Sequence, residues 1–136
     1  MTRILLDTNI VLDVLLDRRG HAEASTRVWA AIENGRAEGV LAAHAVTTIH
    51  YLVQKELGAT HAKRVVSAVL RVLRIASVDS AIMQEALQLP FADFEDAVTA
   101  TAARAAGCRF IVTRDPKGFR ESSVRALTPE AAMPLL

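Results

Sequence analysis

The chain contains 136 residues, of which 51% are hydrophobic and 23% charged, with a formal net charge of only +1. This length suits one compact domain, so we expect a single domain over residues 1–136. The composition excludes disordered, collagen-like and repeat proteins. No apolar run reaches the roughly 20 residues of a membrane span and the start lacks a signal peptide, so we expect a cytoplasmic protein without membrane contact.

The first half of the chain alternates apolar strands with amphipathic helices. Residues 3–6 have the apolar character of a strand covered on both faces, and polar residues after them predict a turn into a helix. Helical spacing of Ala24, Val28 and Ile32 predicts a further helix. The expected order is strand 3–6, helix 10–16, helix 21–34, strand 39–43, helix 45–57 and helix 60–72.

The second half continues this alternation. Asp79 or Ser80 caps a helix, and Gly107 ends the following one. Because strands separated by helices pair in parallel through right-handed crossovers, we expect an α/β fold, a three-layer α/β/α sandwich around a parallel sheet of four to five strands. The expected order is strand 74–78, helix 79–89, helix 93–106, strand 109–113, strand 124–127 and a short final helix.

Four aspartates fall at one edge of this predicted sheet. Asp7 follows the first strand and Asp115 the fourth, while Asp93 and Asp96 begin the helix that leads into the fourth strand. That helix runs antiparallel to its strand, so its N-terminus lies at the carboxyl ends of the strands, where open α/β sheets bind ligands. Asp93 and Asp96 are three residues apart and therefore share one helical face.

Each acid also has an ordinary structural explanation. Asp7 can cap the helix after it, Asp93 and Asp96 can form a capping pair, and an aspartate before proline is a common turn residue. Together, however, carboxylates at one edge repel one another by several kcal/mol unless a cation neutralises them. Oxygen ligands without histidine or cysteine favour Mg²⁺ or Mn²⁺, the cofactor we predict.

Two segments of the sequence resemble the PIN-domain nucleases, and most of all the small bacterial VapC-type toxins of toxin–antitoxin pairs. They are "ILLDTNIVLDVLL" and the more specific "DFEDAVTATAARAAGCRFIVTRDPKGF". The resemblance covers nearly the whole chain. It implies a PIN-like, Rossmann-related α/β/α domain that acts as a divalent-metal-dependent endoribonuclease on RNA, as the toxin of a type II pair.

The resemblance also implies roles for individual residues. The catalytic and metal-binding acids of the family match Asp7, Asp96 and Asp115, with Asp93 as an accessory metal ligand. The family further implies a homodimer and an antitoxin protein whose peptide covers the acidic edge. Positions that usually support the acids by hydrogen bonding match Thr8, Asn9 and Thr113.

The sequence departs from the family pattern at one position. Family members commonly carry a glutamate on the helix after the second strand, and here Thr48 takes that place, with at most a supporting role. Glu56 lies too far along the helix to replace it, and His50 faces the other side. His44 lies one turn earlier at the predicted edge, although a capping or surface role also explains it. We expect at least one metal ion, with lower affinity or activity than in a relative with four acids.

Basic residues beside the last acid are the candidates for substrate binding. Arg114, Lys117 and Arg120 would contact RNA phosphates, unless they form only a solvated charged surface. The missing glutamate leaves open a catalytically weakened PIN-like domain that binds RNA or protein. Phosphotransfer by Asp7 as a nucleophile fits less well, because Asn9 stands where haloacid-dehalogenase-like folds carry a second aspartate.

Three further features have structural interpretations. Cys108, the single cysteine, excludes a disulfide and is expected to be a small core residue. Trp29 shares the apolar stripe of the second helix, so we expect a core or interface anchor. Residues 65–73 carry a strongly apolar helix face that belongs either to the core or to a homodimer interface.

Overall fold

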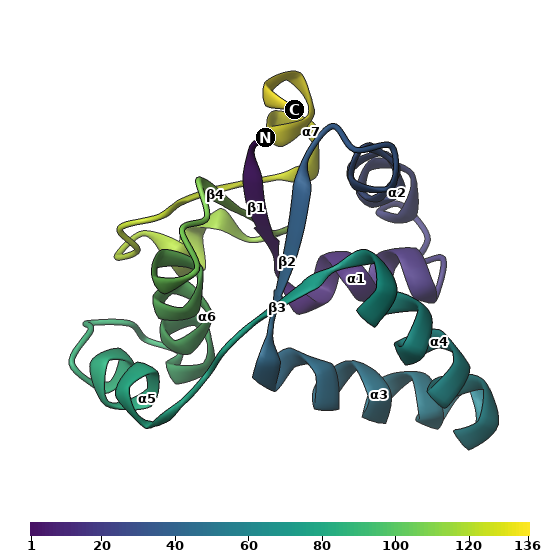
Figure 1. Cartoon of the computed structure of the whole chain (residues 1–136), viewed down its shortest axis with the longest axis horizontal. Coiled ribbons are helices and arrows are strands. Elements are labelled where there is room, and N and C mark those ends of the chain that lie inside the picture. The colour runs from purple at the N-terminus through teal and green to yellow at the C-terminus, as the bar shows by residue number, and fades with distance from the viewer.

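A parallel sheet of five strands lies at the centre of the computed structural model, which describes residues 1–136 (Figure 1). The strand order is β3-β2-β1-β4-β5, so the direction in which the chain adds strands reverses between β1 and β4. This arrangement confirms the predicted α/β class and the parallel sheet. The strands are β1 (Arg3–Leu6), β2 (Glu38–Ala42), β3 (Arg74–Ala76), β4 (Phe110–Val112) and β5 (Arg125–Leu127).

Helices cover both faces of the sheet, which confirms the three-layer prediction. Ile4 and Leu6 of β1 point into the larger core cluster, and Leu5 points into the opposite one. Helices α1 to α4 and α7 pack on the first side, while α6, with α5 against it, covers the second (Figure 1). The helices are α1 (Thr8–Leu15), α2 (Ala22–Glu33), α3 (Ala43–Leu57), α4 (Ala59–Val72), α5 (Ser80–Leu87), α6 (Phe94–Ala105) and α7 (Pro129–Ala132).

The predicted helices and strands agree with the structure to within two residues at every end. Helix α1 begins at Thr8, earlier than predicted, because Asp7 caps it. Two 3₁₀ helices were not predicted, η1 (Pro116–Phe119) and η2 (Met133–Leu135). None of the helices combines the length and hydrophobicity that crossing a bilayer requires.

The apolar residues singled out from the sequence lie mainly in the core. Cys108 is buried, as predicted, and Trp29 packs half-buried against the larger core cluster. On α4 and just after it, Val69 and Leu73 are buried, whereas Leu70 is 47% exposed. The apolar face of α4 is therefore largely core, and only its margin is open to solvent.

Gly39 of β2 marks a place where helices approach the sheet closely. A Cβ atom there would lie 2.5 Å from Leu73 Cδ2 and 2.6 Å from Ile32 Cδ1. Gly39→Ala is therefore expected to destabilise the protein by about 1–3 kcal/mol through overpacking, as measured by urea unfolding. Adding Ile32→Val removes one of the contacted methyl groups and should recover part of the loss. An unchanged midpoint in the single variant would mean that the two helices can move away.

Candidate active site

The carboxyl ends of β1 and β4 form the edge at which the candidate residues meet. Leu6 of β1 pairs with Val112 of β4, and the Asp7 N–H extends this pairing by donating to the Val112 carbonyl at 2.9 Å. Asp115 follows β4 by three residues. The strand order reverses at this point, which is where open α/β sheets bind ligands. We call this edge, with Asp7, Asp93, Asp96 and Asp115, the acidic edge.

Asp7 is the most enclosed of these four acids, with 9% of its surface exposed. Its Oδ1 accepts a hydrogen bond from the Thr8 N–H at 2.8 Å, which caps α1. Its Oδ2 accepts from the Thr113 hydroxyl at 2.8 Å and from the Asn9 amide at 3.4 Å. Burial raises the pKa of Asp7 above the ordinary 3.8, while the hydrogen bonds from Thr113 and Thr8 oppose that rise. One carboxylate thus serves as both helix cap and part of the edge.

Asp93 and Asp96 begin α6 at the same edge. Asp93 is the helix cap, since its Oδ1 accepts from the Asp96 N–H at 3.1 Å. Asp96 is half-buried, and its pKa is raised to about 7, first by burial and then by the charges of neighbouring carboxylates, led by Asp93 and Asp7. Asp115 contributes to the same rise, as does Glu95, which the sequence motif did not single out. These acids therefore behave electrostatically as one group.

Gly118 of η1 brings Asp96 and Asp115 toward a common point. A Cβ atom on Gly118 would lie 3.0 Å from Asp96 Oδ2 and 3.5 Å from Asp115 Oδ2. The Gly118 N–H donates to the Asp115 carbonyl at 3.2 Å, which fixes the turn of the chain just after that acid. The unpredicted 3₁₀ helix and its glycine are thus part of the geometry of the acidic edge.

The segment after β2 contributes a histidine to this edge rather than an acid. His44 is half-buried, its Nε2 lies 3.3 Å from Thr99 Oγ1 of α6, and its Nδ1 is buried without a hydrogen-bond partner. Burial lowers the pKa of His44, while the charges of Glu95 and Asp7 oppose that change. Thr48 lies half-buried one turn further along α3 and adds no charge. The ring of His44 is therefore enclosed between α3 and α6 instead of lying on the open surface.

The three basic residues predicted to bind phosphate differ in their contacts. Lys117 and Arg120 are exposed, on η1 and directly after it. The side chain of Arg114 is only 30% exposed, and its Nε lies 3.2 Å from Oδ2 of the buried Asp13. The structure leaves Lys117 and Arg120 open to a substrate, whereas the charge of Arg114 is used within the protein.

The acidic edge suits a divalent cation without forming a complete coordination shell. No three acidic, histidine or cysteine side chains lie close enough together to hold one ion directly. Burial and then the repulsion of the neighbouring carboxylates raise the pKa of Asp96, and a cation at this edge would oppose both effects. Carboxylates that are too far apart to bind one ion directly can still bind Mg²⁺ through its waters, several of which this ion usually keeps.

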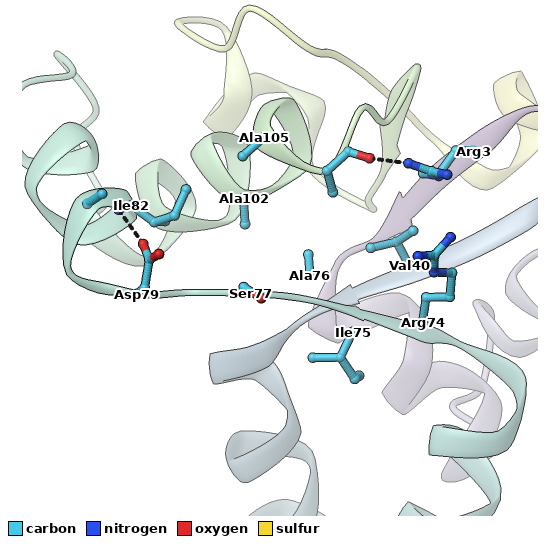
Figure 2. Close-up of a pocket in the computed structure, with 12 residues that line it drawn as sticks. Arg3, Val40, Arg74, Ile75, Ala76, Ser77, Asp79, Ile82, Ala102 and Ala105 are labelled. Carbon is cyan, nitrogen blue, oxygen red and sulfur yellow. Dashed lines mark hydrogen bonds between the residues drawn. The ribbon is translucent and has the colours of Figure 1, made fainter.

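A groove of about 450 Å³ lies elsewhere, between the edge strand β3 and the second half of α6 (Figure 2). Small side chains such as Ala76 and Ala102 line it, with Arg3 and Arg74 toward one end. Both arginines already pair with Glu38, at 3.2 Å and 2.6 Å. None of the acids of the acidic edge lines this groove, so the candidate site is defined by its chemistry and not by a deep cavity.

Comparisons with known sequences agree with the two motifs. The model of the PIN domain family matches residues 3–117 of this chain. Ribonuclease VapC1 of Aquifex aeolicus (strain VF5) is 23% identical over 133 residues, which cover 94% of this chain and 91% of the relative.

Solved structures share the fold. VapBC2 from Rickettsia felis, bound to a DNA fragment from its promoter, has a TM-score of 0.72 at 15% identity and covers 93% of this chain and 98% of its own. A toxin–antitoxin complex from Klebsiella pneumoniae has a TM-score of 0.68 at 18% identity, covering 93% and 97%. The family match over most of the chain confirms the resemblance drawn from the motifs: this protein belongs to the PIN domain family.

Proposed function

We propose that this protein is a divalent-metal-dependent endoribonuclease that hydrolyses RNA phosphodiesters. The observation that carries the proposal is the convergence of Asp7, Asp96 and Asp115, from three separate segments, on the β1–β4 edge. Capping explains Asp7 and Asp93 but not Asp96, whose charge is opposed by its surroundings. The similarity to a relative named a ribonuclease, over most of both chains, supports this class of reaction.

Asp7, Asp96 and Asp115 would hold Mg²⁺ or Mn²⁺ directly or through waters of the ion, with Asp93 as an accessory ligand. When bound, such an ion supplies a water nucleophile at neutral pH and offsets the charge that develops on the phosphate. The protein would contribute ionised carboxylates to the ion. Asp96, with a pKa of about 7, is only partly ionised at neutral pH without metal.

Other residues of the edge would position the acids and the RNA. The Thr113 hydroxyl and the Asn9 amide hold the Asp7 carboxylate through hydrogen bonds to its Oδ2. Lys117 and Arg120, exposed next to Asp115, would contact phosphates of the RNA backbone. The protein's own contribution is therefore orientation and charge placement.

We further propose that the protein is the toxin of a type II toxin–antitoxin pair and forms a homodimer. One structural relative is a toxin–antitoxin complex, and an acidic edge suits an antitoxin peptide that inserts an arginine. Light scattering would test the homodimer. Co-purification with the product of an adjacent small reading frame, followed by loss of cleavage activity in the complex, would test the antitoxin.

Cleavage of a single-stranded RNA by the purified protein is the direct test of the nuclease. We expect cleavage with Mg²⁺ or Mn²⁺, none in excess EDTA, and recovery when Mn²⁺ is added back, because the side chains alone supply no activated water. Equal cleavage with and without EDTA would exclude the proposed chemistry.

Binding without catalysis is the second candidate function, and Thr48 is the observation that favours it. Under the nuclease proposal, Thr48→Glu adds a carboxylate to α3 and should tighten Mn²⁺ binding about tenfold in calorimetry, near 1.4 kcal/mol. Thr48→Gln adds the same length without charge and is the control. Wild type that binds RNA but not Mn²⁺, together with a Thr48→Glu variant that gains neither metal affinity nor cleavage, would establish the binding module instead.

A further inference from the structure

Asp13 is a fully buried carboxylate that the proposed chemistry does not use. It lies on α1, somewhat less than two turns after Asp7, and none of its surface is exposed. Burying a charged group is unfavourable unless other charges and hydrogen bonds compensate for the lost water. Its partners therefore indicate why this position carries an acid.

Two other segments supply those partners. The Ser25 hydroxyl of α2 donates to Asp13 Oδ2 at 3.1 Å, and Arg114 after β4 places its Nε 3.2 Å from the same oxygen. Compensation is incomplete, because Asp13 Oδ1 and Arg114 Nε both lack a hydrogen-bond partner. Apolar residues of similar volume generally stabilise a core as well as such a pair does. Overall stability of the fold therefore does not explain why an ion pair occurs here. The connection that it makes between α1 and the segment after β4 is the better explanation.

Arg114 lies between Thr113, which binds one acid of the acidic edge, and Asp115, which is another. Thr113 binds Asp7 through its hydroxyl, and the Asp115 N–H donates to the same Thr113 oxygen at 3.2 Å. The Arg114 N–H donates to Asn9 Oδ1 at 3.4 Å, a long hydrogen bond. The buried ion pair with Asp13 is thus the one charged contact that ties this segment to α1.

We infer that Asp13 is a positioning residue of the acidic edge: through Arg114 it fixes the Thr113–Asp115 segment relative to Asp7. The inference rests on the proposed function in that these acids are taken to hold the ion. It also accounts for the difference between Arg114, whose charge is used inside the protein, and the exposed Lys117.

Hydrogen exchange of individual amides, measured by NMR on the metal-free protein, tests this inference. In Asp13→Asn, which preserves the volume, the amides of Arg114 and Asp115 should exchange at least about tenfold faster relative to that of Asp96, whose hydrogen-bond acceptor Asp93 caps α6. Ser25→Ala removes the other bond to the same carboxylate but keeps the ion pair, and should not change this ratio. Equal acceleration at all three amides would show a merely structural role and overturn the inference.

A second variant keeps the test decisive if Asp13→Asn does not fold. The double variant Asp13→Asn/Arg114→Gln removes both charges, so neither an unpaired anion nor an unpaired cation remains, and it should release the same two amides. Unchanged exchange of the Asp115 amide in this second variant would overturn the inference, just as equal acceleration at all three amides would in Asp13→Asn.

Mn²⁺ calorimetry separates this inference from the nuclease proposal. We expect Asp13→Asn to weaken Mn²⁺ binding at least about tenfold and Ser25→Ala to leave it unchanged. Local exchange that accelerates in a protein without any Mn²⁺ affinity would support the positioning role and overturn the proposed function. If Mn²⁺ binding is lost in Asp96→Asn but intact in Asp13→Asn, and exchange in Asp13→Asn is unchanged, the proposed metal site is supported and the positioning role of Asp13 is overturned.

Discussion

Asp96→Asn is expected to reduce metal-dependent RNA cleavage by at least about 100-fold without unfolding the protein. Asparagine keeps the size of the side chain and removes the charge that would hold a cation. Losing such a ligand costs several kcal/mol of transition-state stabilisation, and each 1.36 kcal/mol is a factor of ten in rate. Since Asp96 does not cap its helix, the fold does not depend on its carboxylate. Initial rates on a fluorescent single-stranded RNA with Mn²⁺ measure the effect.

Asp79→Asn is the matched control for this experiment. Asp79 caps α5 by accepting from the Ile82 N–H at 3.0 Å, much as Asp93 caps α6, but it lines the separate groove that no acid of the acidic edge lines. Asparagine is an equally good cap, so this variant should keep both stability and cleavage. Asp93→Asn should lose activity only about tenfold, as expected for an accessory position.

Asp7→Asn completes the comparison and should match the loss seen for Asp96→Asn. Its carboxylate receives hydrogen bonds from Thr8 and Thr113, and asparagine can accept only at its carbonyl oxygen, so some loss of stability is expected as well. Rates are therefore compared at a temperature well below both melting transitions. Full activity in Asp7→Asn and in Asp96→Asn would remove the acidic edge from the mechanism.

The sheet and its acidic edge could be predicted because short segments carry the necessary patterns by themselves. Continuous apolar runs at Ile4–Leu6 and Phe110–Val112 suit only strands that are covered on both faces. The crossover rule then makes those strands parallel, which brings the residues that follow them to one edge. Asp7 and Asp115 therefore follow two paired strands at the same edge of the sheet.

Contacts between distant residues could not be predicted in this way. Asp13 interrupts the apolar face of α1 beside Ile10 and Leu16, which is a usable signal of a buried charge, but nothing local identifies Arg114 as its partner. The approach of Gly118 to Asp96 depends on a short 3₁₀ helix whose position is set by packing of Phe119 against the core. Such details require the assembled fold.

Without bound metal, Asp96→Asn is expected to raise the melting temperature at pH 8 and to change it little at about pH 3.5, below the ordinary pKa of aspartate. The pKa of Asp96 in the folded protein is about 7, above the ordinary 3.8. The folded state therefore holds this proton more tightly than the unfolded state does. That contribution to stability is fully present below about pH 4 and is lost as the pH rises through 7. At pH 8 the wild type carries a charge that is opposed first by burial and then by the neighbouring carboxylates, and the variant does not.

The expected gain at pH 8 is about 1 kcal/mol, or roughly 3 to 4 °C, because Asp96 is half-buried and water screens part of the repulsion. Melting curves in EDTA at the two pH values measure it. The difference between the melting temperatures of the two proteins isolates the effect of Asp96. Both proteins retain the other shifted groups: the pKa of His44 is lowered by burial, and that of Glu38 is lowered mainly by Arg74. A variant that melts at a lower temperature than wild type at pH 8 would contradict the repulsion.

Saturating Mn²⁺ is expected to reverse the order of the two proteins at pH 8. An ion at 100 times its dissociation constant stabilises the folded state by about 2.7 kcal/mol, which exceeds the repulsion that it relieves. The variant lacks the ligand and should gain much less. An acid present only to favour the helix N-terminus would stabilise the wild type with or without metal, and the curves would not cross. The crossing therefore separates an acid that binds a cation from one that merely begins a helix.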